Sequence, residues 1–168
     1  MYYDLFLEMK KVLGNVEKWL DKADAHAKEK SFDPNLFAGF RLAPDQLAFA
    51  RQIQIACDTA KLGASRLTGK EAPAQTDNEQ TLDELRARVR SVITYLDGFS
   101  AKDFEGAATR SVTQPRWEGK VMTGKDYFIE HVQPNFYFHA SHTYAILRHN
   151  GVPVGKRDYL GALTQTLP

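Results

Sequence analysis

Three histidines near the end of the chain share one face of a predicted helix. His139, His142 and His149 fall within an arc of about 80° when successive residues are placed 100° apart. Imidazoles three residues apart can direct ring nitrogens at one metal ion, and helical bundles often hold such ions between their helices. His139 and His142 are therefore candidate metal ligands, whereas His149 favours the negative end of the helix dipole. The alternative is that His139 and His142 are hydrogen-bonded core residues that bridge to neighbouring helices.

A catalytic metal also needs a third protein ligand and an open coordination position. No histidine occurs between His26 and His131, so the second and third predicted helices can supply none. The best substitutes are Asp58, which shares a helix face with Gln54, and Glu130. Two histidines and one carboxylate suit nickel, zinc or iron. Asp58 could equally pair with a nearby basic side chain at the bundle surface.

The other reactive side chains carry weaker signals. Cys57 is the single cysteine and lies in an apolar stretch, which predicts a buried, inert thiol. Arg116, Lys125 and the segment 156–158 could form a basic rim for an anionic substrate, although such residues are usually solvated surface. The sequence contains no glycine-rich phosphate loop, nucleophile elbow or Cys-x-x-Cys pair.

The composition is typical of one soluble globular domain. The 168 residues include 22 basic and 21 acidic ones, a formal charge of +1, so no global field attracts nucleic acid or an anionic membrane. No apolar run is long enough to span a bilayer. One cysteine excludes an internal disulfide and agrees with a reducing compartment. We expect a single domain over residues 1–168 that is cytoplasmic and binds neither nucleic acid nor membranes.

Hydrophobic periodicity predicts four long helices. Apolar residues recur in steps of three and four over residues 2–30, 44–67, 81–98 and 124–150. Pro44 suits the first turn of the second helix, and the segment from Thr81 to Glu84 has the form of a capping box for the third. Pro134 is expected to kink or break the fourth helix near Gln133.

The connecting segments differ in character. Residues 31–43 are too apolar for a free linker, so we expect them to fold over one end of the bundle. Residues 68–80 are polar and could stretch to about 44 Å, which is long enough to cross the bundle. An up-down-down-up order is then available, with an ordinary antiparallel hairpin as the alternative. Residues 99–122 show no sustained period and predict an extended or hairpin-like excursion. The predicted fold class is an all-α four-helix bundle with a kinked fourth helix.

The segment Pro134–Gly161, together with the segments Arg41–Asp45 and Gln54–Asp58, resembles a bacterial subfamily of the DinB/YfiT-like metalloenzyme superfamily, a domain of unknown function. The resemblance covers nearly the whole chain. It implies an up-down-down-up four-helix bundle that is frequently dimeric. Better-studied relatives bind a divalent metal such as nickel or zinc through one His on the second helix and an His-x-x-x-His pair on the fourth. Some of them are thiol-dependent transferases or hydrolases.

This chain departs from the metal-binding pattern of those relatives. His139 and His142 are three residues apart, and Thr143 stands where the second histidine of the family pair would fall. The second predicted helix has no histidine at all. Only His139 therefore matches a family ligand.

Two functions follow from these observations. The first is a metal-dependent transferase or hydrolase, with His139 and His142 as ligands, Asp58 as a third, and nickel, zinc or iron as the cofactor. The second is a non-catalytic bundle that binds a small molecule or a partner and has lost the family metal. In both cases we expect a homodimer. The expected pocket beside the fourth helix is lined by Gln54, Asn135 and Tyr144.

Overall fold

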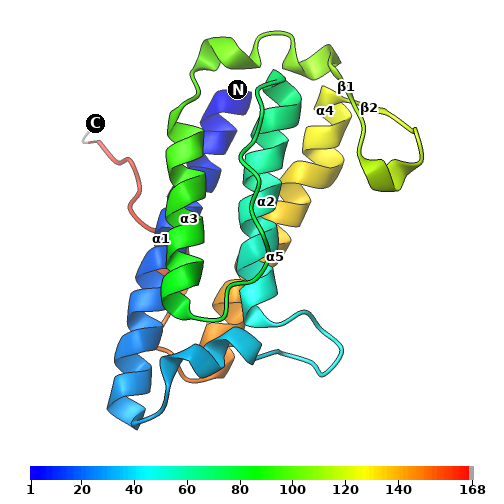
Figure 1. The fold of residues 1–168 in the computed structure, drawn as a ribbon. Coiled ribbons are helices and arrows are strands. Elements are labelled where there is room, and N and C mark those ends of the chain that lie inside the picture. Colours follow the sequence, from blue (N-terminus) through cyan, green and yellow to red (C-terminus); the bar gives the residue numbers. More distant parts are fainter. Residues whose placement is uncertain (167–168) are drawn as a thin grey trace.

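Four long helical stretches lie side by side in the computed structural model, which describes residues 1–166 (Figure 1). Residues 167–168, the end of the predicted domain 1–168, lie outside the described part. The helices are α1 (Tyr2–Lys30), α2 (Phe49–Thr68), α3 (Leu82–Asp97), α4 (Gly124–Tyr127), α5 (Gln133–His149) and the short α6 (Lys156–Leu160). The predicted helical class is confirmed.

The helices enclose one core. In Figure 1, α1 and α5 run down the view, whereas α2 and α3 run up it. α2 packs against both α3 and α5, and α1 packs against the same two helices. Large aromatic side chains, among them Trp19, Phe37, Phe49 and Phe136, are wholly buried between them, and this burial is the main source of stability. Among residues 1–166, no helix is both long and apolar enough to cross a membrane.

The predicted start of the second helix at residue 44 is wrong, because α2 begins at Phe49. Pro44 instead occupies the second position of a β-turn that is closed by the hydrogen bond from Gln46 N to Ala43 O (3.1 Å). Phe49 is wholly buried, and its backbone N–H donates to Phe40 O (2.9 Å). Tertiary packing of this aromatic residue therefore sets the helix start.

The connecting segments behave as their composition predicts. Residues 31–43 contain the 3-10 helix Pro34–Gly39, which packs on α1, α2 and α3. Residues 69–80 run as an extended chain along α2, so that α3 begins at the other end of the bundle (Figure 1). Residues 99–122 contain the expected excursion, in which β1 (Ser111–Val112) pairs antiparallel with β2 (Met122–Thr123).

The fourth stretch is distorted just before Pro134, as expected. Between α4 and α5, residues Phe128–Val132 form a π-helical turn, in which hydrogen bonds join residues five apart. Pro134 has no N–H to donate to the preceding turn. The helix continues through this point without a break, and the widened turn places His131 and Asn135 on the side that faces α2.

Candidate functional site

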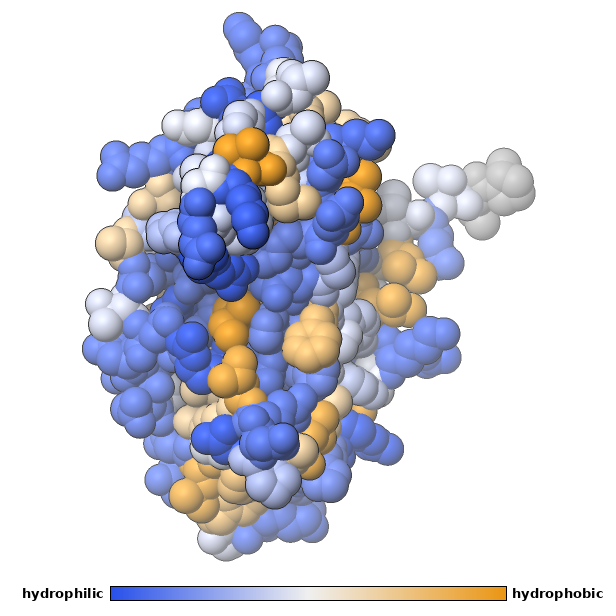
Figure 2. All heavy atoms as spheres, turned by 90° about the vertical axis from the view of Figure 1, so that its right-hand side faces the viewer, coloured by the Kyte–Doolittle hydropathy of each residue, from blue (hydrophilic) through white to orange (hydrophobic). Residues whose placement is uncertain are grey.

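A pocket lies between α2 and the distorted fourth stretch. It has a volume of about 140 Å³, and we call it the inner pocket. Its lining consists of Ile55, Asp58, Thr59, Leu62, Arg66, Gln114, Arg116, Tyr127, His131 and Asn135. An adjoining outer cleft of about 370 Å³ shares His131 and Asn135 and adds Glu130, Pro134, Phe138 and His139. Figure 2 views the molecule from the side of the hairpin and α5, where a few hydrophobic side chains show near the centre among polar ones.

Two arginines give the inner pocket a positive side. Arg66 Nη1 donates to the Tyr127 hydroxyl (2.9 Å), and Arg116 Nη2 donates to His131 Nε2 (3.0 Å). Within residues 1–166, neither guanidinium forms an ion pair with a carboxylate. Burial raises the pKa of Tyr127, so its hydroxyl stays protonated. Because that oxygen accepts from Arg66, its own proton is free to be donated.

His131 is neutral at physiological pH. Burial, followed by the charges of Arg116 and Arg66, lowers its pKa below the ordinary value of 6.5. A guanidinium can only donate, so His131 Nε2 accepts from Arg116 and the proton of the neutral ring is on Nδ1. The lone pair that a metal or a substrate proton would need is therefore already engaged.

Gln114 brings a buried donor to the same pocket. The residue is 7% exposed and lies on the pocket lining, directly before the 3-10 turn Pro115–Trp117. In the described part of the chain, its amide Nε2 has no hydrogen-bond partner. A buried donor without an acceptor costs free energy, so this amide is suited to an acceptor atom that enters the pocket.

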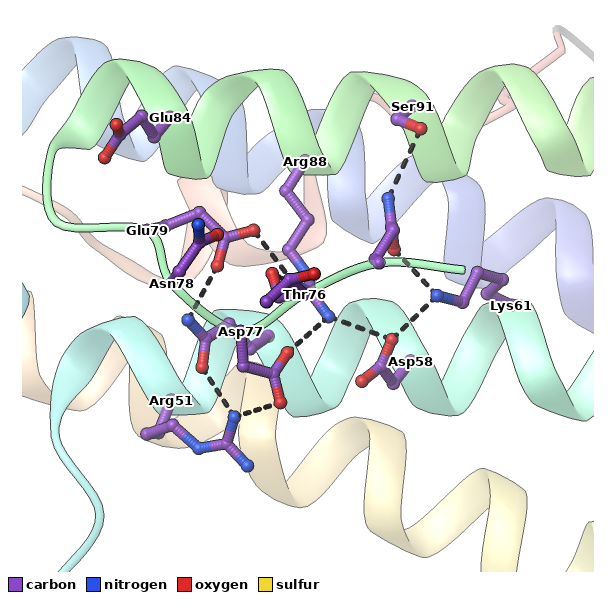
Figure 3. A network of polar contacts seen from close by, with 12 residues as sticks. Arg51, Asp58, Lys61, Thr76, Asp77, Asn78, Glu79, Glu84, Arg88 and Ser91 are labelled. Carbon is purple, nitrogen blue, oxygen red and sulfur yellow. Dashed lines mark hydrogen bonds and ion pairs between the residues drawn. The ribbon is translucent and has the colours of Figure 1, made fainter. Parts of the chain in front are cut away.

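Asp58 lines the pocket but is already ion-paired. Its carboxylate lies 2.9 Å from Arg88 Nη2 and 3.0 Å from Lys61 Nζ. The Arg88 side chain is 1% exposed and also contacts Asp77 (2.8 Å) and Glu79 (2.9 Å) (Figure 3). These contacts tie the extended segment 69–80 to α2 and α3.

The network in Figure 3 is electrically self-contained. Its three cations match its three carboxylates: Arg51, Lys61 and Arg88 against Asp58, Asp77 and Glu79. Asp58 is therefore neutralised from within the network and leaves the charges of Arg66 and Arg116 uncompensated.

The predicted pocket residues are distributed over three places. Asn135 does line the inner pocket, where its Nδ2 donates to Thr59 Oγ1 (2.7 Å) and joins α5 to α2. Gln54 is part of the network, because it accepts from Arg51 and donates to Glu79. Tyr144 packs against the rings of Trp19 and Tyr159, next to α1 and α6. Neither Gln54 nor Tyr144 lines the inner pocket.

His139 bridges to α2 as the alternative interpretation predicted. Its Nδ1 lies 2.7 Å from Gln52 Oε1, and Gln52 Nε2 donates to Leu47 O (2.9 Å). Gln52 oxygen is therefore the acceptor, and His139 Nδ1 carries the proton. Burial, followed by the charges of His142 and Arg51, lowers the pKa of His139 to about 4. The imidazole is a neutral and weak base.

His142 points elsewhere. Its Nδ1 donates to Phe138 O of the preceding turn (2.7 Å), and its ring lies against the Phe138 ring with centroids 4.0 Å apart. His139 lines the outer cleft, Asp58 lines the inner pocket, and His142 lines neither. The structure does not bring the three predicted metal ligands together.

These donors do not fit a divalent metal. Asp58 is bound by two cations, His131 accepts from a third, and the nearby guanidiniums would repel an incoming ion. Over residues 1–166 no three His, Cys, Asp or Glu side chains form a group that could hold a metal. Asn135, the lining residue four positions after His131, is an amide and adds no imidazole to the pocket.

Cys57 is inert, as the sequence predicts. Its side chain is wholly buried in α2, and burial raises the pKa of the thiol to about 12. At neutral pH it holds no thiolate for nucleophilic attack.

Several residues of the pocket were missed in the sequence. Arg66, Gln114 and Tyr127 lie on different elements, and no spacing rule joins them. His131 and Asn135 did carry a signal, since residues four apart on a helix share a face. Arg116 was grouped with Lys125 and the segment 156–158 in a basic rim; Arg116 lines the inner pocket, whereas Lys125 and the segment 156–158 do not.

Comparison with known proteins agrees with the fold. Residues 1–160 match the family described as "Domain of unknown function (DUF1993)". The crystal structure of a DinB family member protein from Shewanella denitrificans is 53% identical and superposes with a TM-score of 0.96, covering 100% of this chain and 96% of that one. No curated protein matches the chain. The chain therefore belongs to the DUF1993 family of helical, DinB-like proteins.

Proposed function

We propose that this protein is a metal-independent, non-catalytic DinB-like bundle that binds a small organic molecule. The ligand would occupy the inner pocket and extend into the outer cleft. The observation that carries this proposal is the state of the pocket donors. Gln114 Nε2 and the Tyr127 hydroxyl have protons without acceptors, whereas the Asp58 carboxylate and His131 Nε2, which line the same pocket and could bind a metal, already have partners.

The chemistry of the lining favours binding over catalysis. A general base needs a pKa near the working pH and a free lone pair. Asp58 is ion-paired on two sides, His131 is engaged through Nε2, and His139 has a pKa of about 4. Cys57 is a buried thiol. None of these four groups meets the requirement for a base or a nucleophile.

Elemental analysis of untagged protein tests the metal half of this proposal. We expect less than a tenth of an equivalent of nickel, zinc or iron, and no rise in melting temperature with added divalent ions. A stoichiometric metal that is lost in His139→Ala would refute the proposal. It would favour the metal-dependent transferase or hydrolase that uses His139, His142 and Asp58.

Intrinsic fluorescence tests the binding half. The Trp117 ring lies 5.9 Å from the Tyr127 ring and 6.2 Å from the His131 ring, so it reports directly on the inner pocket. Ligands from a small-molecule library that change this emission should compete with one another. These ligands should also bind the Asn135→Leu variant more weakly, because Asn135 lines both the inner pocket and the outer cleft. Binding that Asn135→Leu leaves unchanged would contradict the assignment of the site.

The quaternary structure and the helix order belong to the same proposal. We infer an up-down-down-up four-helix bundle, which is supported by the helix directions in Figure 1. We also infer a homodimer, which is supported by exposed apolar side chains such as Leu36 and Ile129. Light scattering should give twice the 19.0 kDa chain mass. A cytoplasmic location fits the single unpaired cysteine, and cell fractionation tests it.

A further inference from the structure

We propose that the ligand of the inner pocket carries a carboxylate, which binds between Arg66, Arg116, Gln114 and Tyr127. This inference rests on the proposed function and specifies the class of ligand. The four groups come from α2, from the turn Pro115–Trp117 and the residue before it, and from α4, and they all line one pocket of about 140 Å³.

Charge selects an anion for this pocket. Arg66 and Arg116 form no ion pair in the part of the chain that the structure describes, whereas the network around Arg88 balances its own charges. Arg66 is half-buried and Arg116 is exposed, and a bound anion would gain charge-assisted hydrogen bonds from both arginines. A cationic ligand would be repelled by them, and a neutral acceptor would gain only weaker hydrogen bonds.

The number of donor groups favours a carboxylate among the anions. Gln114 Nε2 is a buried donor without an acceptor, and the Tyr127 hydroxyl retains a free proton because its oxygen accepts from Arg66. With the two guanidiniums, this makes four donor groups. An ionised carboxylate offers two oxygens with about four lone-pair sites, so each of the four groups could donate one hydrogen bond to it.

The remaining walls indicate what the carboxylate is attached to. Ile55 and Leu62 give the inner pocket an apolar wall, and Phe138 and Pro134 do the same for the outer cleft. Phe138 is 54% exposed, so its ring is available to a ligand. The ligand class is therefore a small organic acid with a short apolar or aromatic body.

Calorimetric titration of the full chain with three matched probes tests this inference. Benzoate has the proposed charge and shape, benzamide is its neutral analogue, and phenyl phosphate carries a larger oxyanion. We expect benzoate to bind at least about tenfold more tightly than benzamide and phenyl phosphate, with an affinity that falls as salt is added. The inference is overturned if benzamide binds as well as benzoate, if phenyl phosphate binds best, or if none of the three binds.

Substitutions assign the binding to the four groups. Arg116→Met should weaken benzoate about tenfold or more, whereas Arg148→Met, an exposed arginine outside the pocket, should leave it unchanged. Gln114→Leu should also weaken benzoate about tenfold without lowering the melting temperature, because it removes a donor that has no partner in the free protein.

The outcomes separate this inference from the proposed function. Benzoate that binds equally to wild type, Arg116→Met and Gln114→Leu would overturn the carboxylate assignment. If benzamide binds and Asn135→Leu abolishes that binding, the pocket is a ligand site and only the ligand class is wrong. If library ligands also bind independently of Asn135, the proposed function fails as well.

Discussion

Removal of the buried guanidinium of Arg88 is the sharpest test of the network that borders the pocket. Arg88→Met keeps an unbranched chain of similar length and removes the charge. The Arg88 side chain is 1% exposed and contacts carboxylates of Asp58, Asp77 and Glu79 at 2.8 to 2.9 Å. The substitution leaves three carboxylates facing one another without their shared cation.

The size of the effect follows from the burial of each partner. Breaking a fully buried ion pair by removing one member costs about 3–5 kcal/mol. Here Glu79 is 11% exposed, whereas Asp58 and Asp77 are 30% and 35% exposed and can recover part of their hydration. We therefore expect the lower end of that range, about 3 kcal/mol of unfolding free energy. For a domain of this size the melting temperature should fall by roughly 6–12 °C.

Urea denaturation at pH 7 and low salt measures this loss directly. Arg90→Met is the matched control, because Arg90 lies on the same helix and pairs with Glu17 while 66% exposed. An exposed pair of this kind contributes at most about 1 kcal/mol. The argument for a buried network would be refuted if the unfolding free energies of Arg88→Met and wild type differed by less than about 1 kcal/mol. Such a result would show that the three carboxylates are hydrated in the absence of Arg88.

Three further substitutions test other parts of the structure. The pKa of His139 is about 4 in the folded chain and about 6.5 in the unfolded chain, so the unfolding free energy is highest above pH 6.5 and falls as the pH drops towards 4. Urea titrations between pH 4 and 6.5 should show a smaller fall in His139→Gln than in wild type. An equal fall in both proteins would exclude His139 as its origin. Gly124→Ala should lower the unfolding free energy by about 1–3 kcal/mol in thermal unfolding, because its Cβ would lie 1.9 Å from Ala107 O. Gly39→Ala is the control, since a Cβ there meets nothing within 4 Å. Equal losses of unfolding free energy in the two variants would contradict this argument. Thr81→Ala should cost about 1 kcal/mol, since Thr81 Oγ1 accepts from Glu84 N, and an unchanged denaturation midpoint would show that the cap contributes nothing.

The helices were predictable because their signals are local. The apolar period fixes the buried face of α1, and the capping box at Thr81 fixes the start of α3. The start of α2 was not predictable, because Pro44 suits both the first turn of a helix and the second position of a β-turn. The choice was decided by the burial of Phe49 against the segment 31–43, which is a tertiary contact.

The pocket was less predictable than the helices for a related reason. A helical wheel tells which side chains share a face, and on that basis His139 and His142 belonged together. It does not tell which hydrogen bond each imidazole forms. Gln52 from α2 engages His139, and the carbonyl of Phe138 engages His142, so the two rings are used separately. The partner of His139 comes from another helix, and no spacing within the fourth helix encodes it.

The same distinction explains why the sequence pointed to a metal whereas the structure favours an anion. Counting residue types placed Asp58 among the acidic ligands, since an isolated carboxylate attracts cations. In the folded chain, Lys61 and Arg88 neutralise Asp58, and Arg88 is itself held by Asp77 and Glu79 from the extended segment 69–80. The sign of the pocket is therefore set by Arg66 and Arg116 alone. Displacement of Asp77 and Glu79 with the extended segment would leave the network with excess positive charge and would make the surroundings of the pocket more positive.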